Sequence, residues 1–151
     1  MERSEHGNDT QAIEALTLRQ FTSLNWQSGA TADREAFSSD FRSNASLYPS
    51  GRPAKQQSVE VFVERMKGLV GTKLHTFHES VLGTEIFVFG NVAVAVAACE
   101  MVENGTHVNR GVEMLLLLKN ECVWQTAAQA WDSETPSNPI PNRLLSRNAS
   151  A

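Results

Sequence analysis

The sequence holds few of the residues from which disulfide frameworks and thiolate metal sites are built. Its 151 residues include two cysteines, Cys99 and Cys122, which are too few for either kind of site. Basic residues are also few, since 13 lysines and arginines against 17 aspartates and glutamates leave a formal charge of −4. Without a basic excess, a broad surface for nucleic acid or for an anionic membrane is not expected.

Long apolar runs are missing as well. No stretch of the sequence approaches the roughly 18 consecutive apolar residues of a membrane span. The polar residues 1–9 lack the apolar core of a signal peptide. From these absences we expect a cytoplasmic protein whose partners include neither nucleic acid nor a membrane.

Familiar catalytic and cofactor motifs are absent too. The chain has no H-E-x-x-H pair, no G-x-S-x-G elbow and no glycine-rich phosphate loop. His75 and His78 stand three residues apart in a stretch with strand character, so their side chains point to opposite faces and cannot bind one metal ion together. We therefore expect neither a metal nor a cofactor.

What the sequence does contain is enough apolar material for one core. The chain is 41% hydrophobic, and its length suits a single domain. We expect this domain over residues 10–145, with flexible tails at residues 1–9 and 146–151, where polar and small residues dominate.

Helical periodicity characterises the first half of the chain. Apolar residues recur at helical spacing over residues 10–28, and a short helix is expected over residues 32–38. A third helix is expected after the N-cap residue Ser58, because one apolar stripe follows it: Val59, Phe62, Val63, Met66 and Val70.

From residue 74 onward the apolar spacing changes to two, which is typical of strands. The segments Gly90-Asn91, Asn104-Gly105 and 119–122 separate four such stretches and are hairpin signals. Helices followed by an antiparallel meander predict the α+β class, with three N-terminal helices packed on one face of a curved four-strand antiparallel sheet.

Strand pairing follows by counting if the loops are Gly90-Asn91, Asn104-Gly105 and Asn120-Glu121. The face with Phe87, Phe89 and other bulky residues would then lie under the helices. The opposite face would carry three small residues and would need another cover, so we expect a homodimer through Ala93, Ala95 and Ala97.

One end of the bulky face collects polar residues, which are Glu79, Glu100, Asn109, Glu113 and Asp132. Carboxylates crowded in a partly apolar cavity have raised pKa values and can exchange protons near neutral pH. The alternative is that they face water or pair with Arg110 and Lys73, as in a structural ion-pair network. A bulge at Gly111 would bring Arg110 onto the same face.

Four large side chains are candidates for the mouth of a pocket between helices and sheet: Trp26, Phe41, Tyr48 and Met66. The alternative is that they belong to the ordinary core. Tyr48 differs from the others because its hydroxyl, if buried, needs a partner and can donate to a ligand.

The order of these features resembles the NTF2-like superfamily and, within it, the SnoaL-like group of small uncharacterised bacterial proteins. The resemblance spans about residues 10–145. It is carried by the turn Tyr48-Pro49-Ser50-Gly51 and by short stretches of the C-terminal half: Phe77-His78-Glu79, Phe89-Gly90-Asn91-Val92-Ala93, Cys99-Glu100, Arg110-Gly111, Val123-Trp124-Gln125 and Ala130-Trp131-Asp132-Ser133-Glu134. It implies a cone-shaped α+β barrel with a pocket at its open end.

In such a pocket, the resemblance implies that an acid moves a proton while a tyrosine or a second acid polarises a carbonyl. On this chain those roles fall to Asp132 or Glu113 and to Tyr48. The ligand-binding candidates are Trp26, Glu79, Glu100, Asn109 and Arg110.

Two functions stay open at this point. One is cofactor-independent proton transfer on a small apolar or carbonyl-containing molecule, as in an isomerase, a cyclase or a dehydratase. The other is a non-catalytic dimeric module that senses a ligand or accompanies a larger enzyme.

Overall fold

The computed structural model describes residues 2–25, 34–69 and 75–146. The ordered elements are α1 (Glu2–Thr22), α2 (Arg34–Ser39), β1 (Phe41–Tyr48), β2 (Gln57–Ser58), α3 (Val59–Leu69), β3 (Phe77–Phe89), β4 (Val92–Glu103), β5 (His107–Asn120), β6 (Val123–Ser133) and α4 (Asn142–Ser146). The α+β class is as predicted. Helix α1 begins at Glu2 rather than at Thr10, and the expected boundary between the first two helices falls on residues 26–33, outside the described residues.

The sheet is larger than the sequence predicted. It has six strands in the order β2-β1-β6-β5-β4-β3, and β1 runs parallel to β6 while every other pairing is antiparallel. The predicted meander forms β3 to β6. The four-strand expectation was wrong because it included neither β1 nor β2, although Phe41, Ala45 and Leu47 bury one side of β1 against the core.

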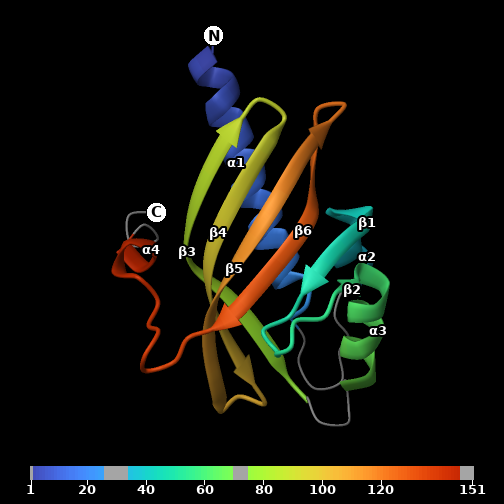
Figure 1. Ribbon diagram of the computed structural model, residues 1–151, viewed down its shortest axis with the longest axis vertical. Coiled ribbons are helices and arrows are strands. Elements are labelled where there is room, and N and C mark those ends of the chain that lie inside the picture. The colour runs from blue at the N-terminus through green and yellow to red at the C-terminus, as the bar shows by residue number, and fades with distance from the viewer. Residues whose placement is uncertain (1, 26–33, 70–74, 147–151) are drawn as a thin grey trace.

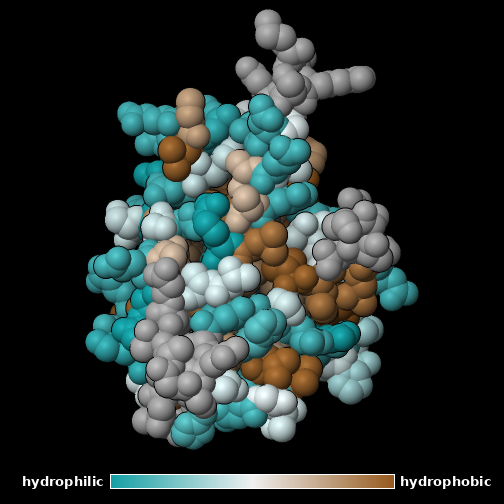
Figure 2. Space-filling model, turned by 180° about the vertical axis from the view of Figure 1, so that it is seen from behind, coloured by the Kyte–Doolittle hydropathy of each residue, from teal (hydrophilic) through white to brown (hydrophobic). Residues whose placement is uncertain are grey.

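The helices lie mainly on the inner face of the curved sheet. Helix α1 crosses behind the meander, and α2 and α3 stand beside β1 (Figure 1). Helix α3 begins as predicted, because the Ser58 hydroxyl accepts a 3.1 Å hydrogen bond from the Val61 amide. The surface seen from the α1 side is largely hydrophilic, with apolar side chains gathered near its middle (Figure 2).

The hairpin loops decide which residues face the helices. The first loop is as predicted, with Phe89 opposite Val92. The second loop is one residue longer than predicted, since Glu103 pairs with His107. The third loop falls one residue later, at Glu121 and Cys122, which both have positive φ angles (51° and 68°).

The shift of the second loop brings Glu113, Leu115 and Leu117 of β5 onto the same face as the alanines of β4. The first hairpin keeps its predicted register there, but α1 packs on its alanine face rather than on its bulky face. Ala93, Ala95 and Ala97 lie inside, packed with α1 residues such as Ile13 and Leu16, and Ala95 is 0% exposed. The homodimer expected through this alanine face is therefore corrected: the small residues make room for α1 of the same chain.

The bulky residues lie on the opposite, outer face. Phe87 and Phe89 are 69% and 74% exposed, and their neighbours on paired strands include Val92, Val94 and Leu116. Further along this face, α4 covers the sheet where Ile140 and Leu144 pack against Ala98. We call the exposed set Phe87, Phe89, Val92, Val94, Met114 and Leu116 the outer patch.

The backbone around Gly111 is regular. Gly111 pairs with Cys99 on one side and with Ser133 on the other, so the bulge considered there does not form. A side chain at this position would meet the Asp132 carbonyl oxygen at 2.5 Å. Glycine is therefore needed for the close approach of β5 and β6 rather than for a change of face.

Candidate functional site

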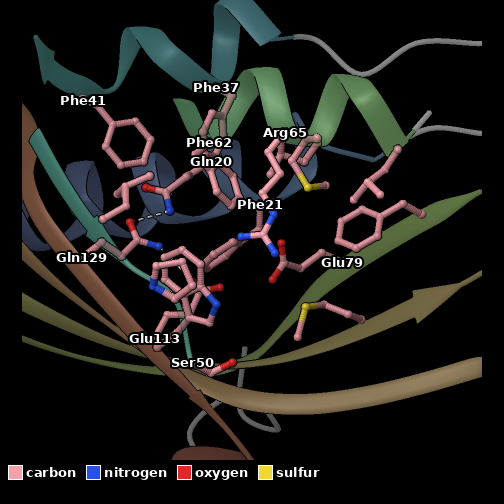
Figure 3. A pocket seen from close by; sticks show the side chains of 18 of the residues that line it. Gln20, Phe21, Phe37, Phe41, Ser50, Phe62, Arg65, Glu79, Glu113 and Gln129 are labelled. Atoms are coloured by element: carbon pink, nitrogen blue, oxygen red, sulfur yellow. Dashed lines mark hydrogen bonds between the residues drawn. The ribbon is translucent and has the colours of Figure 1, made fainter. Parts of the chain in front are cut away.

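A cavity of about 380 Å³ lies between the inner face of the sheet and the helices (Figure 3). This volume is in the range of small-molecule pockets. Most of its wall is apolar, and much of it is aromatic: Phe21, Phe37, Phe41, Phe62, Phe77 and Trp131, together with Leu24, Leu47, Met66, Leu69 and Met101. The polar wall residues include Gln20, Ser50, Arg65, Glu79, Glu103, Glu113 and Gln129.

Three of the polar residues reach the cavity because they occupy inward positions on adjacent parts of the meander. Glu113 on β5 precedes the inward Leu115 and Leu117, and Glu79 on β3 follows the inward Phe77. Gln129 lies on β6. All three are buried.

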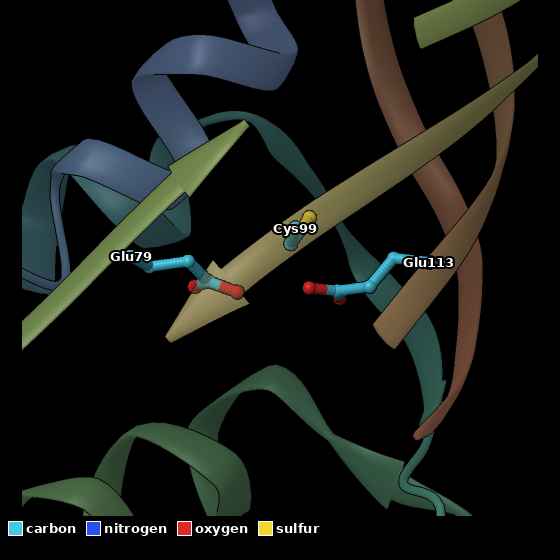
Figure 4. A group of neighbouring side chains, drawn as sticks. All are labelled: Glu79, Cys99 and Glu113. Carbon is cyan, nitrogen blue, oxygen red and sulfur yellow. The ribbon is translucent and has the colours of Figure 1, made fainter. Parts of the chain in front are cut away.

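The two glutamate side chains extend toward one another over β4, as Figure 4 shows. Their carboxyl oxygens and the Cys99 sulfur all lie within 4.8 Å of one another. Two like charges this close in a desolvated site repel strongly, so the pair favours holding a proton.

The titration of the pair follows from its surroundings. Burial raises the pKa of Glu79 well above 4.5, and the charge of Glu113 and the hydrogen bond between the two carboxyls raise it further. Burial also raises the pKa of Glu113, to about 7, against the opposing effect of hydrogen bonds from Gln129 and Glu79. The pair therefore favours holding one proton at neutral pH, and the hydrogen bond that Gln129 donates to Glu113 favours Glu113 as the partner that ionises.

A short chain of amides supports Glu113. Gln129 Nε2 donates to Glu113 Oε1 at 2.5 Å, and Gln20 Nε2 on α1 donates to Gln129 Oε1 at 2.7 Å. Figure 3 shows this chain at one side of the cavity. Because the donors point toward Glu113, they stabilise its carboxylate form.

Cys99 does not add a nucleophile to this group. Burial and the two neighbouring carboxylates raise the pKa of its thiol, so the sulfur stays protonated. For a metal ion to use these three residues, protons would have to leave both Glu79 and Cys99. The expectation that the protein binds no metal stays a prediction. The protonated Glu79 and Cys99 do not favour binding of a metal ion at this group.

The structure places the sequence-predicted site residues in different locations. Glu79 and Glu113 meet in the cavity. The Asp132 side chain is 65% exposed on the outer face, 3.9 Å from Arg52, and Tyr48 is also exposed. Neither of these two lines the cavity described above.

Glu100, Asn109 and Arg110 are likewise outside the cavity wall. Glu100 Oε2 accepts a 2.8 Å hydrogen bond from Arg110 Nε, which is the ion-pair alternative that the sequence left open. Phe41 and Met66 do line the cavity, whereas Trp26 lies outside the described residues. The expected polar face thus divides into two because of the shifted loops.

Sequence reasoning missed Gln20 and Gln129. Gln20 continues the buried stripe of α1 formed by Ile13, Leu16 and Phe21, and a polar residue on such a stripe is an available signal of a buried polar contact. Gln129 lies on the same face as Ala95, and this face was not expected to lie under the helices. Arg65, which extends from α3 into the cavity (Figure 3), carried no signal beyond its place in an amphipathic helix.

No family model matches the sequence, and no curated protein matches it either. Solved structures do match. A hexachlorocyclohexane dehydrochlorinase of LinA type 3 from Novosphingobium barchaimii superposes with a TM-score of 0.73 at 12% identity, over 88% of this chain and 91% of that one. An NTF2-like protein of unknown function from Shewanella baltica superposes with a TM-score of 0.60 at 13% identity, over 85% and 95%. This chain has the NTF2-like fold.

A further structural match is a putative scytalone dehydratase from Novosphingobium aromaticivorans. Its TM-score is 0.72 at 12% identity, and the match covers 88% of this chain and 89% of that one. At these identities the likeness concerns the fold. Among the helices that the structure describes, none is long and apolar enough to span a membrane.

Proposed function

We propose that this NTF2-like chain binds a small, mainly apolar molecule in its cavity and moves a proton on it without a cofactor. Glu113 acts as the base and Glu79 as the neutral acid. The observation that carries the proposal is the pair of buried, facing carboxyls in the wall of a mainly apolar cavity. Burial raises both of their pKa values, that of Glu113 to about 7. A base with a pKa close to the working pH is the most effective one.

The two carboxyls suit a carbonyl compound with an acidic C–H group. The Glu113 carboxylate takes the proton from the carbon beside the carbonyl, while the Glu79 O–H hydrogen-bonds the carbonyl oxygen, on which the electron pair collects. Return of the proton to another carbon gives an isomer. Departure of a leaving group from the neighbouring carbon gives an elimination.

The structural relatives support this reaction class. The names of the two enzymes describe a dehydratase and a dehydrochlorinase, and both kinds of reaction remove a proton and a leaving group. The amide chain gives Glu113 a fixed orientation, and the apolar wall limits access of water to it. We further place the chain in the SnoaL-like group on the layout of its elements.

Deuterium exchange into 2-tetralone tests this proposal without knowledge of the natural substrate. We expect the protein to accelerate exchange of the protons beside the carbonyl, followed by proton NMR in deuterated buffer. The rate should rise with pH through about 7, as Glu113 ionises. Glu113→Gln should lower the enzymatic rate by about 10²- to 10⁴-fold, because the base is lost.

Asp132→Asn is the matched control for this experiment. It removes an exposed carboxylate that lies outside the cavity, so its exchange rate should stay within about twofold of the wild-type rate. Equal rates for the wild type and Glu113→Gln, or a loss of exchange in Asp132→Asn alone, would contradict the assignment of Glu113 as the base.

The alternative, a non-catalytic dimeric module, is favoured by the outer patch. Phe87 and Phe89 are far more exposed than phenylalanines in a soluble monomer usually are. A second copy of the chain placed against this patch would bury them.

Light scattering tests this dimer. The wild type should have twice the mass of the chain, and the double variant Phe87→Ser, Phe89→Ser should be a folded monomer with an unchanged far-ultraviolet spectrum. Val61→Ser, at an exposed apolar residue on α3, is the control and should remain dimeric. A monomeric wild type would refute the dimer, while the proton-transfer proposal would stand.

A further inference from the structure

The amide chain ends at an acceptor that has no partner. Gln20 is 1% exposed and lines the cavity. Its Nε2 group donates to Gln129, but its Oε1 atom has no hydrogen-bond partner among residues 2–25, 34–69 and 75–146. Buried carbonyl oxygens are almost always hydrogen-bonded, so this end of the chain lacks a donor.

The charge on Glu113 sets the direction of the chain. An ionised Glu113 can only accept, so Gln129 must present its NH₂ group to it. The Gln129 carbonyl oxygen then accepts from the Gln20 NH₂ group, and the Gln20 carbonyl oxygen is left over. A protonated Glu113 can instead donate to Gln129, which allows both amides to turn round and leaves the Gln20 NH₂ group unpaired.

We propose that the bound molecule donates a hydroxyl or N–H hydrogen bond to Gln20 Oε1, and that this contact holds the amide chain in the direction in which Gln129 donates to Glu113. This inference rests on the proposed function and narrows its substrate class. The ligand is a compact, mainly apolar molecule that carries a hydrogen-bond donor. A ring-shaped ligand suits the surrounding wall, in which four aromatic side chains form a row with 5.0–5.7 Å between the centroids of successive rings: Phe41, Phe37, Phe62 and Trp131.

The contact couples recognition to catalysis. A ligand that fills the Gln20 acceptor favours the chain direction that stabilises the Glu113 carboxylate, so ligand binding prepares the base. The other titratable groups around the site are Glu79 from β3, Cys99 and Glu103 from β4, and Arg65 from α3. Among the described residues, none of these four side chains hydrogen-bonds the Gln20 amide, whose partner is Gln129.

Two probes of nearly equal size distinguish the contribution of a ligand's hydrogen-bond donor to binding from the contribution of its apolar rings. 2-Naphthol carries a hydroxyl donor, whereas 2-methoxynaphthalene has the same rings without a donor. Calorimetric titrations at pH 7 in phosphate and in imidazole buffer give both the affinity and the number of protons released. We expect 2-naphthol to bind about tenfold more tightly and to release protons, and 2-methoxynaphthalene to release none.

The variants identify the acceptor. Gln20→Leu should bind both probes with similar affinity and without proton release. Gln11→Leu makes the same change at an exposed position on the same helix and should behave as the wild type. Gln129→Leu keeps the Gln20 acceptor but breaks the chain, so it should keep part of the preference for 2-naphthol and lose the proton release.

Each outcome decides between the claims. If Gln20→Leu binds 2-methoxynaphthalene normally and still prefers 2-naphthol, the hydroxyl is held elsewhere; the inference is then wrong, and the proposed function stands. If Gln20→Leu binds neither probe, Gln129→Leu decides. When this variant binds 2-naphthol and releases as many protons as the wild type, ligand binding is not coupled to the ionisation of Glu113 through the amide chain. When it binds 2-naphthol without releasing protons, the coupling is supported. If the wild type binds neither probe, the proposed function fails and the inference falls with it.

Discussion

Replacing Glu113 by glutamine is expected to stabilise the protein above pH 7 and to remove the part of the fall in stability between about pH 4.5 and pH 7 that Glu113 contributes beside Glu79. The pKa of Glu113 is about 7 in the folded chain, compared with 4.5 for an unhindered glutamate. The folded state therefore binds a proton more tightly than the unfolded state. The contribution of the Glu113 proton to the free energy of unfolding is fully present below about pH 4.5 and is lost as the pH rises toward 7.

The size of this effect follows from the two pKa values. A change from 4.5 to about 7 corresponds to roughly 3 kcal/mol of unfolding free energy. Glutamine has nearly the same shape, carries no charge and can still accept the hydrogen bond from Gln129. Urea unfolding of the wild type and of Glu113→Gln at pH 5 and pH 8 measures the difference.

Glu64→Gln is the control for this comparison. Glu64 is exposed on α3, and its removal should leave the pH dependence of the unfolding free energy as in the wild type. If Glu113→Gln shows the same fall in stability between pH 5 and pH 8 as the wild type and Glu64→Gln, then Glu113 is not the group that titrates.

Placing a carboxylate at Ala95 is expected to unfold the chain, whereas the same change one residue earlier is expected to be tolerated. Ala95 is 0% exposed and packs in the cluster that includes Ile13 and Leu16 of α1. A glutamate there would bury an unpaired charge and would push α1 away from β4. We expect a loss of about 4 kcal/mol or more of unfolding free energy.

Val94→Glu is the matched variant on the outer face. Val94 is 44% exposed, so the new carboxylate reaches water and the monomer should keep its fold with a change of about 1 kcal/mol or less. The same variant should weaken a dimer that forms through the outer patch. Thermal unfolding and light scattering check both expectations. A well-folded Ala95→Glu protein beside an unfolded Val94→Glu protein would reverse the assignment of the two faces.

Much of the architecture could be predicted from local patterns. The N-cap at Ser58, the apolar stripe that follows it and the turn at Gly90-Asn91 each act over a few residues. The structure has all three, except that the last stripe residue, Val70, lies outside the described residues. The α+β class followed from the change in apolar period. The resemblance to NTF2-like proteins agrees with the structural matches.

The faces of the sheet could not be predicted in the same way. A shift of one residue in a loop exchanges the two faces of a strand, and two loops differ from the simple two-residue count. Where the Asn104 and Gly105 loop includes one more residue, β5 changes its register. A further shift between Val81 and Gly83 also separates Glu79 from the residues expected beside it.

The candidate site was predicted in part for a related reason. Glu79 and Glu113 were singled out as members of one acidic group, and the structure brings them together. Asp132 and Glu100 were placed with them by the assumed register, and Arg110 by a bulge at Gly111 that does not form. All three lie outside the cavity wall. Gln20 comes from α1, whose position over the sheet is set by tertiary packing that no strand pairing describes.

The titration of the Glu113 carboxyl shows whether Glu79 and Glu113 share a proton at neutral pH. Carbon-13 labelling of glutamate side-chain carboxyls allows each one to be followed by NMR, and the Glu113 signal is the one that disappears in Glu113→Gln. We expect a midpoint near pH 7 for Glu113, with Glu79 still protonated there. A Glu113 midpoint close to 4.5, with both carboxyls ionised at neutral pH, would contradict a shared proton and the base assigned to it.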